Sequence, residues 1–536
     1  MGIRATTDSA QPSVRQGAGA GPGRHPHLVA VAALTAVAAV GYSVFALVRN
    51  YNFQTSSYDL VIFDEAVRSY AHFGPGISII KGVHNGFGPH FSILGDHWSP
   101  ILASLAPLYW IDSSPQVLLV AQAALFALAI PPLWLFTRRA FGGGSKATIA
   151  AYLVAVAYAL SWPVASALAF DFHEVAFAPV LTAVALERLQ AGRLRTALIA
   201  LAALLLVKED MGLFVAGIGV YLAVARPRQV PRQLVVGLAL VAVGVADTFI
   251  ATYVLIPAFG GHSNYYWAYT ALGNNVPQAI GHLITHPASW KLLVTPRVKL
   301  ETTLWLFGAF CFLSLRSPLA LAVLPLLLER MLANLFPYWW VTSYQYNAYL
   351  VVVLLCAAVD GAARLDRDLL GRRRPVTGDG PSAEPAAAPP PGRRWTVALV
   401  CAAAMCAVAL ALVPRFAFGA ALHPGFYQRD AQEQAAAAAA AAVPSGVTVE
   451  AVNNLGPHLA ARDTVLLWDG DGHTPPLGSP WVVANIKRLQ FTFSSVREQR
   501  QHVALLERSG YRVVFQRGGY VVLHRQGPAD LKESAG

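Results

Sequence analysis

Long apolar runs dominate the sequence and leave few folds open to it. Eleven runs reach the length of a membrane-spanning helix or come close to it, and polar segments separate them. A helix that crosses the hydrocarbon core of a bilayer needs about 20 predominantly apolar residues. The runs cover residues 28–48, 115–136, 147–167, 175–190, 196–207, 211–225, 233–256, 302–315, 318–335, 346–363 and 395–413.

The content of charged residues supports a membrane protein and excludes a soluble enzyme. Only 13% of the 536 residues are charged, whereas a soluble globular chain has about 25%. We therefore predict an α-helical polytopic membrane protein with about 11 transmembrane helices. Some runs are shorter than a lone spanning helix requires. Residues 196–225, which include Lys208, Glu209 and Asp210, could instead form one long helix with a charged centre.

Basic residues are distributed unevenly between the two sides of the predicted membrane domain. With the N-terminus inside, the cytoplasmic segments carry 20 Lys and Arg residues and the short outer loops carry 7. Positive charge in short loops marks the cytoplasmic side. The sequence therefore predicts a multi-pass protein of the bacterial plasma membrane with a cytoplasmic N-terminus. This topology accounts for the net charge of +11 without a nucleic-acid partner.

The polar segments divide the chain into predicted domains. A disordered cytoplasmic tail at 1–27 precedes a transmembrane domain at 28–363, which has long outer loops at 49–97 and 257–301. A cytoplasmic linker at 364–394, a last transmembrane helix at 395–413 and an extracytoplasmic α/β domain at 414–536 follow. In the last domain we expect helices near 428–442 and 495–508, a hairpin turn at 517–520, and strands at 447–451, 464–468, 481–485, 511–516 and 519–524.

Polar residues that could carry chemistry gather in the predicted outer loops. The first outer loop, 49–97, is long for a connection, and loops of this length tend to be functional. The apolar stretch after it, bracketed by Trp98 and Trp110, is short enough to predict an interfacial or re-entrant helix rather than a span.

Six short motifs give the chain a resemblance to a known family. Together they resemble the bacterial membrane-protein family called domain of unknown function 2079, over about residues 50–525. That family is similar to the GT-C glycosyltransferases, integral membrane enzymes that take sugars from polyprenyl-phosphate donors. The motifs are Tyr58-Asp59-Leu60-x-x-Phe63-Asp64, Gly95-Asp96-His97-Trp98-Ser99-Pro100, Phe170-Asp171-Phe172-His173-Glu174, Val207-Lys208-Glu209-Asp210, Tyr344-x-Tyr346 and Asn453-Asn454-Leu455-x-x-His458-Leu459.

The resemblance implies that an acidic residue just after the first span is the catalytic base. Asp59 matches that position, and Asp64, followed by Glu65, is the competing match. Both have structural alternatives. Asp59 could cap a helix, and the Asp64-Glu65 pair could bind Arg68 at helical spacing.

Sugar transfer from a lipid phosphate also needs positive charge or hydrogen-bond donors for the leaving phosphate. Lys208, His97, His173, Arg297 and Lys299 could supply them. No nucleotide-binding motif is visible. No metal ligands are assigned, although a divalent cation is possible. The residues expected to bind substrate are Glu65, Asp96, His97, Asp171, His173, Glu174, Lys208, Glu209, Asp210 and Tyr346.

Some of these residues also have structural interpretations. Asp96 and His97 could form a turn before Pro100, and the aromatic run 336–346 could be an interfacial belt or a platform on which a sugar stacks. The glycine-flanked motif at 469–473 is expected to be a turn.

The predicted function is an integral membrane glycosyltransferase that works on the outer face of the membrane. Its expected partners are a polyprenyl-phosphate-linked sugar, membrane lipid, and a glycan, lipid or protein acceptor of the cell envelope. A transporter or flippase is the alternative, but polar residues would then line a path near the midplane and an internal repeat would be usual. A non-catalytic scaffold that displays the C-terminal domain is the third hypothesis.

Overall fold

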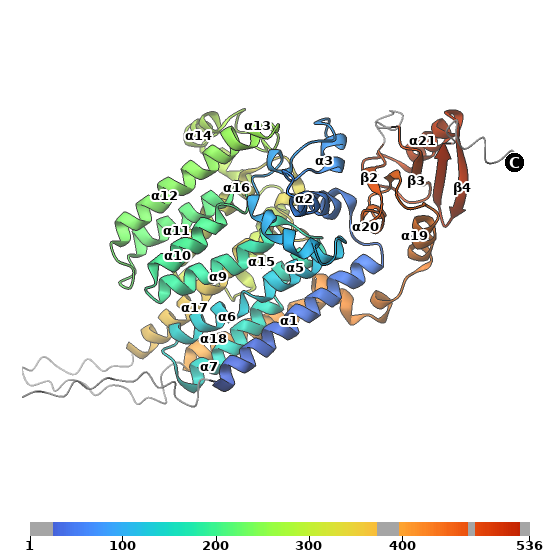
Figure 1. The fold of residues 1–536 in the computed structure, drawn as a ribbon. Coiled ribbons are helices and arrows are strands. Elements are labelled where there is room, and N and C mark those ends of the chain that lie inside the picture. Colours follow the sequence, from blue (N-terminus) through green and yellow to red (C-terminus); the bar gives the residue numbers. More distant parts are fainter. Residues whose placement is uncertain (1–24, 372–395, 470–477, 526–536) are drawn as a thin grey trace, which may run out of the picture.

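The chain folds into a helical body with a small sheet domain beyond one end of it (Figure 1). A computed structural model describes residues 25–371, 396–469 and 478–525. Within these ranges six helices are long and apolar enough to cross a membrane: Pro26–Tyr51, Gln116–Ala140, Gly144–Ala169, Gln233–Ala258, Gln345–Leu369 and Thr396–Arg415. Shorter apolar helices cover Pro100–Tyr109, Leu194–Leu204 and Met211–Ala225.

The predicted apolar runs all contain helix, so the predicted class of α-helical polytopic membrane protein is confirmed. The number of spans stays a prediction. The helices are α1 (His25–Tyr51), α5 (Gln116–Ala127), α6 (Ile130–Ala140), α7 (Gly144–Ala159), α8 (Trp162–Ala169), α9 (Phe177–Gln190), α10 (Leu194–Leu204), α11 (Met211–Ala225), α12 (Gln233–Ile250), α15 (Arg297–Gly308), α16 (Leu324–Leu332), α17 (Ala348–Gly371) and α18 (Thr396–Leu412).

Two predicted boundaries need correction. Helix α1 begins at His25, inside the predicted tail 1–27, of which residues 1–24 lie outside the described ranges. Helix α17 continues to Gly371, into the predicted linker 364–394. Arg364 forms an ion pair with Asp360 one turn earlier, at 2.7 Å, and this pair supports the extension.

The alternative of one long helix over 196–225 is also wrong. Helix α10 ends at Leu204 and α11 starts at Met211. Charge is costly inside a membrane helix. The loop between the two helices places Lys208 and Glu209 beside partners of opposite charge on other segments.

Apolar side chains are buried at the centre of the body and exposed at its edge. In α17 every residue from Ala348 to Val359 is almost completely buried. Helices α1 and α12 instead expose apolar side chains such as Val37, Val235 and Phe249, each more than half exposed. An apolar surface of this kind belongs in lipid.

Short helices occur in the two long loops that connect the long helices. The first long loop contains α2 (Ile62–Ala71) and α3 (Ile79–His84). The stretch after it forms a 3₁₀ helix at Pro100–Leu105 and α4 (Ala106–Tyr109). At 1.5 to 2 Å per residue this element is roughly 15 to 20 Å long. It is therefore too short to span, as predicted. The second long loop contains α13 (Ile256–Ala258) and α14 (Val276–Thr285).

The C-terminal segment forms the predicted α/β unit. Its five strands lie in the order β2-β1-β3-β5-β4, with β1 parallel to β2 and β3, and β5 antiparallel to β3 and β4. Gly518 and Gly519 form the predicted hairpin turn, and both have positive φ, which glycine adopts easily. The elements are α19 (Ala431–Ala441), β1 (Thr448–Ala451), α20 (Gly456–Leu459), β2 (Thr464–Leu467), β3 (Trp481–Asn485), α21 (Val496–Arg508), β4 (Tyr511–Arg517) and β5 (Tyr520–Arg525).

The two ends of the body are clearly different. Helix α1 starts, α17 ends and α18 starts at one end, and the sheet domain lies past the other end of α1 (Figure 1). This arrangement puts the start of α1, the end of α17 and the start of α18 together, opposite the C-terminal domain. Which end faces the cytoplasm stays a prediction from the distribution of Lys and Arg.

Candidate functional site

Asp59 lies on an irregular turn directly after the first long helix. Residues Ser57–Val61 form a π-helical turn, η1, in which Tyr58 has non-helical backbone angles. Such turns are frequent at functional sites. Asp59 Oδ1 lies 3.3 Å from His173 Nε2, and the Ser56 hydroxyl donates to Asp59 Oδ2 at 3.2 Å. The Asp59 side chain is 27% exposed. These contacts are to side chains, whereas a capping aspartate would accept from backbone amides.

The segment that carries His173 is held tightly against this turn. Ser56 donates to Asp171 Oδ2 through its backbone amide at 2.8 Å and its hydroxyl at 2.6 Å. Gln122 on α5 donates to the Asp171 carbonyl and accepts from the His173 amide. Asp171 has a φ of 46°, in the left-handed region. Burial, followed by the nearby charge of Asp59, raises the pKa of Asp171 to about 6.

The loop between α10 and α11 brings a lysine next to this segment. Lys208 Nζ lies 3.2 Å from Glu174 Oε1 and 5.8 Å from the centre of the Tyr346 ring. Glu209 accepts from the Trp98 amide and lies 2.8 Å from His97 Nδ1. The loop therefore connects the motif at 170–174 to His97 and Trp98, at the end of the first long loop.

A second lysine is buried under tyrosine rings nearby. Lys81 Nζ lies 3.0 Å from Asp96 Oδ1, and the Tyr266 hydroxyl donates to the same oxygen at 2.7 Å. The Lys81 side chain is 3% exposed and lies 5.2 Å from the centre of the Tyr58 ring. Burial lowers the pKa of Lys81, but the Asp96 carboxylate and neighbouring tyrosines outweigh this and raise it above its ordinary value. Lys81 is therefore a charged, ordered group at neutral pH.

His97 lies between the surroundings of Lys81 and those of Lys208. Its ring stacks on Tyr266 with centres 4.7 Å apart, while its Nδ1 contacts Glu209. Burial lowers the pKa of His97, but the carboxylates of Glu209 and Asp96 together raise it above the ordinary value. The predicted turn role of Asp96 and His97 is thus incomplete, because both side chains pair with charged partners.

The aromatic run 336–346 lies beside both lysines. Tyr338 stacks on Tyr346 with ring centres 6.2 Å apart. Burial raises the pKa of Tyr338 to about 12, against the opposing effect of the charges of Lys81 and Lys208. Phe336 also approaches the Tyr266 ring, at 6.3 Å. These aromatic side chains lie beside the charged cluster, which consists of the ion pairs Lys81–Asp96, His97–Glu209 and Lys208–Glu174.

Asp64 and Glu65 have other partners. Arg68 donates to Asp64 at 2.8 Å, and the Tyr109 hydroxyl donates to its other oxygen at 2.8 Å. Asp64 is fully buried, and burial raises its pKa to about 6 against the effect of Arg68. Glu65 accepts from the Ser78 hydroxyl and the Ile80 amide at the start of α3.

Two basic candidates lie apart from this cluster. Lys299 is completely buried and donates to the carbonyls of Leu292, Met331 and Ala333. Arg297 is 88% exposed and forms an ion pair with Glu301. Asp210 follows Glu209 in the loop, and its Oδ1 is buried with no hydrogen-bond partner among the described residues.

A family model covers most of the chain. Residues 49–522 match the model described as "Predicted membrane protein (DUF2079)". The chain belongs to this family. No curated protein matches it. A similar solved structure is the crystal structure of ArnT from Cupriavidus metallidurans bound to undecaprenyl phosphate, with 15% identity and a TM-score of 0.49 over 94% of this chain and 99% of that one. The family description names no reaction, so the activity must be argued from the site.

Several site residues were not among the sequence candidates. Ser56, Tyr58, Lys81, Tyr266 and Tyr338 all contact or influence the charged cluster. Tyr58 and Ser56 could have been found as neighbours of Asp59 in the sequence. Lys81 and Tyr266 could not be found in this way. Both contact Asp96, and Tyr266 is 170 residues away from Asp96 in the chain.

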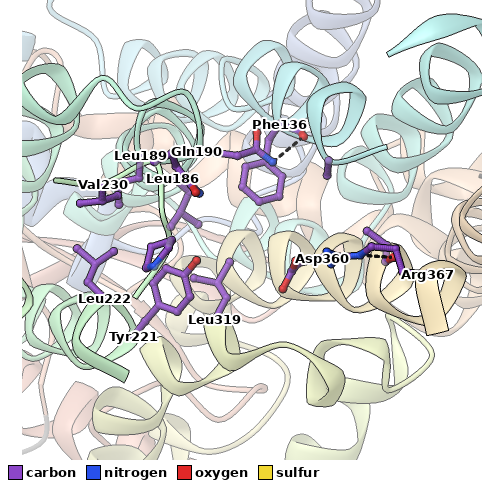
Figure 2. A pocket seen from close by; sticks show the side chains of 14 residues that line it. Phe136, Leu186, Leu189, Gln190, Tyr221, Leu222, Val230, Leu319, Asp360 and Arg367 are labelled. Atoms are coloured by element: carbon purple, nitrogen blue, oxygen red, sulfur yellow. Dashed lines mark hydrogen bonds between the residues drawn. The ribbon is translucent and has the colours of Figure 1, made fainter. Parts of the chain in front are cut away.

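A partly enclosed pocket lies far from these residues. It has a volume of about 220 Å³ and lies where α6, α9 and α17 end, with Asp360 and Arg367 on one wall and Gln190 bonded to the Phe136 carbonyl (Figure 2). Tyr346 precedes α17 and Arg367 follows about 20 residues later, which corresponds to about 30 Å of helix. This pocket is therefore not part of the Asp59 cluster.

Proposed function

We propose that the chain is an integral membrane glycosyltransferase that moves a sugar from a polyprenyl-phosphate donor to a cell-envelope acceptor on the outer face of the membrane. One observation carries the proposal. The partly exposed carboxylate of Asp59 contacts His173, and the next residue, Glu174, forms an ion pair with Lys208. A base and a cation held by the same short segment, His173-Glu174, at the end of a helical membrane body suit the displacement of a lipid phosphate.

In the proposed reaction Asp59 is the general base. It takes the proton of the acceptor hydroxyl as the acceptor oxygen forms a bond to the anomeric carbon. The bond from that carbon to the phosphate oxygen breaks, and polyprenyl phosphate leaves with the electron pair. His173 orients the carboxylate through the 3.3 Å contact. Lys208 and Lys81 provide positive charge for the leaving phosphate.

The surroundings of the cluster support a lipid-linked donor. Phe73, Trp110 and Ile111, at the ends of the neighbouring short helices, are 90%, 63% and 87% exposed. Trp is enriched at the level of lipid headgroups, so these residues suit contact with the membrane surface. The charged side chains also gather at one end of the body rather than along a path through it, which favours an enzyme over a transporter.

No step of this mechanism uses a metal ion. In the part of the chain that the structure describes, no group of three or more His, Cys, Asp or Glu side chains is arranged to hold one.

The test is the substitution Asp59→Asn, with Asp64→Asn as its matched control. Asn keeps size and hydrogen bonding but is not a base. We expect Asp59→Asn to lower turnover of a polyprenyl-phosphate sugar about 100- to 10,000-fold, with donor binding near normal. Asp64→Asn should be much milder, because Asp64 is buried against Arg68 and Tyr109.

Turnover is measured with purified protein and short-chain polyprenyl-phosphate sugars, and nucleotide sugars serve as negative controls. Full activity of Asp59→Asn together with loss in Asp64→Asn would move the base to Asp64. Activity that persists in the double variant would overturn a carboxylate base in this loop.

A further inference from the structure

The sheet domain is bonded directly to the turn that carries Asp59. The backbone carbonyl of Asn453 accepts from the Ser57 amide at 2.6 Å and from the Ser57 hydroxyl at 2.9 Å. The side-chain Oδ1 of Asn453 accepts from the Tyr58 amide at 2.9 Å. One residue of the C-terminal domain thus binds two consecutive amides just before Asp59.

These bonds satisfy donors that the turn cannot satisfy itself. The first amides of any helical segment have no partner within the segment, and a side chain at the N-cap normally accepts from them. Here Ser56 is the N-cap residue and makes no side-chain cap bond. Its hydroxyl is used by Asp59 and Asp171 instead. Asn453 therefore caps the turn from a distant part of the chain.

The position of these amides determines where Asp59 points. Tyr58 has the non-helical backbone angles within η1, and Asp59 follows it directly. Holding the Tyr58 amide fixes the peptide that leads into this irregular residue. If that bond is lost, the turn can relax toward a regular helix, and a change of about 1 Å in a reacting group can cost about 100-fold in rate.

Close packing holds Asn453 in register with the turn. Gly456, at the start of α20, approaches Ser57 so closely that a Cβ there would collide with the Ser57 hydroxyl. The Phe53 and His458 rings stack with centres 3.8 Å apart, and Asn52 donates to the carbonyl of Phe426 at 2.6 Å. The C-terminal segment is thus docked both on the turn and on the residues that precede it.

We propose that Asn453 is a positioning residue, through which docking of the C-terminal domain aims Asp59 at His173 and completes the site. This inference rests on the proposed function for its effect on rate, but the structural role of Asn453 can be tested without any substrate. It also assigns a role to the Asn453-Asn454 motif, whose side chains lie outside the charged cluster.

The structural test is hydrogen exchange in the full-length protein. Asn453→Leu keeps a similar size but removes the side-chain oxygen that accepts from the Tyr58 amide. In this variant the Ser57–Tyr58 peptide should exchange about 3- to 10-fold faster, as expected for one lost hydrogen bond. Asn454→Ala is the matched control, because Asn454 donates to Tyr520 within the sheet domain and makes no bond to the turn. Unchanged exchange in Asn453→Leu, or an equal change in Asn454→Ala, would overturn the proposal.

The kinetic test separates positioning from folding. Asn453→Leu should lower kcat for the polyprenyl-phosphate sugar about 10- to 100-fold, with the KM for the donor within about twofold. Asn453→Asp keeps an oxygen acceptor and should recover most of kcat, while its added charge shifts the acid limb of the pH profile upward. A loss confined to KM, or no recovery in Asn453→Asp, would contradict a positioning role.

If Asn453→Leu cannot be purified, Gly456→Ala replaces it, because the added methyl group displaces Ser57 and leaves Asn453 in place. It should show the same faster exchange and lower kcat, and unchanged values would overturn the proposal. If the wild-type protein turns over no polyprenyl-phosphate sugar, the proposed function fails, and the exchange measurement still decides whether Asn453 holds the turn.

Discussion

Two aspartates five residues apart in the same loop have opposite environments. Asp59 is partly exposed and faces His173, whereas Asp64 is fully buried and bonded to Arg68 and Tyr109. A substrate hydroxyl cannot reach the oxygens of a fully buried carboxylate, whereas the partly exposed Asp59 is accessible. This difference in burial favours Asp59 as the proposed base and Asp64 as a structural residue that ties α2 to α4.

The burial of Asp64 predicts a measurable dependence of stability on pH. Its pKa in the folded protein is about 6, above the ordinary value of 3.8, so the folded state binds more protons between these values. Wild type should therefore lose stability as pH rises from 4 to 6, whereas Asp64→Asn, which cannot ionise, should not. The variant should gain about 2 kcal/mol relative to wild type over this interval.

Thermal unfolding in detergent at pH 4, 5, 6 and 7 gives this comparison directly. The difference between the two proteins isolates Asp64 from other titrating groups. A constant difference across the series would show that Asp64 ionises at its ordinary pKa, and the structural assignment would then be incorrect.

At the scale of elements, α11 and α12 pack through facing glycines. Gly212 and Gly219 on α11 lie against Gly244 and Gly237 on α12, and a Cβ at any of the four would collide with backbone atoms of the other helix. Small residues at such contacts let membrane helices approach closely. Because α12 is otherwise largely exposed, this contact holds it to the body.

Gly244→Leu should therefore push α12 away from α11 or strain the contact between the two helices. Overpacking of this kind costs about 1–3 kcal/mol, and the midpoint of thermal unfolding in detergent should fall. Gly41→Ala is the control, because Gly41 is also in a membrane helix but has no atom within 4 Å of an added Cβ. It should be neutral or slightly stabilising, since alanine favours helix. Equal midpoints for the two variants would contradict the role of the glycine contact.

At the scale of the whole molecule, the sheet domain and the start of α7 should lie on opposite sides of the membrane. The Lys and Arg distribution places the region before α7 in the cytoplasm and the C-terminal domain outside. On a background without the native cysteines, an impermeant thiol reagent applied to intact cells should label Ser509→Cys but not Ser145→Cys. Both positions are exposed. The reverse pattern would invert the topology.

The elements of this chain could be predicted because each depends on nearby residues. A spanning helix needs only a long apolar run, and the strands of the C-terminal domain show alternation and turn residues within a few positions. The boundaries at His25 and Gly371 were less predictable, because polar residues can extend a helix beyond the apolar run through local pairs such as Arg364 with Asp360.

The sequence by itself determined that the chain is a helical membrane protein with a C-terminal α/β unit, and it identified the motifs around Asp59, His173 and Lys208. Only the tertiary structure decided which carboxylate meets His173, because that contact joins segments more than 100 residues apart. The same holds for Asn453, whose role depends on a backbone amide 395 positions away. Local composition selects helices and strands, whereas the partners of a charged side chain are selected by packing between distant segments.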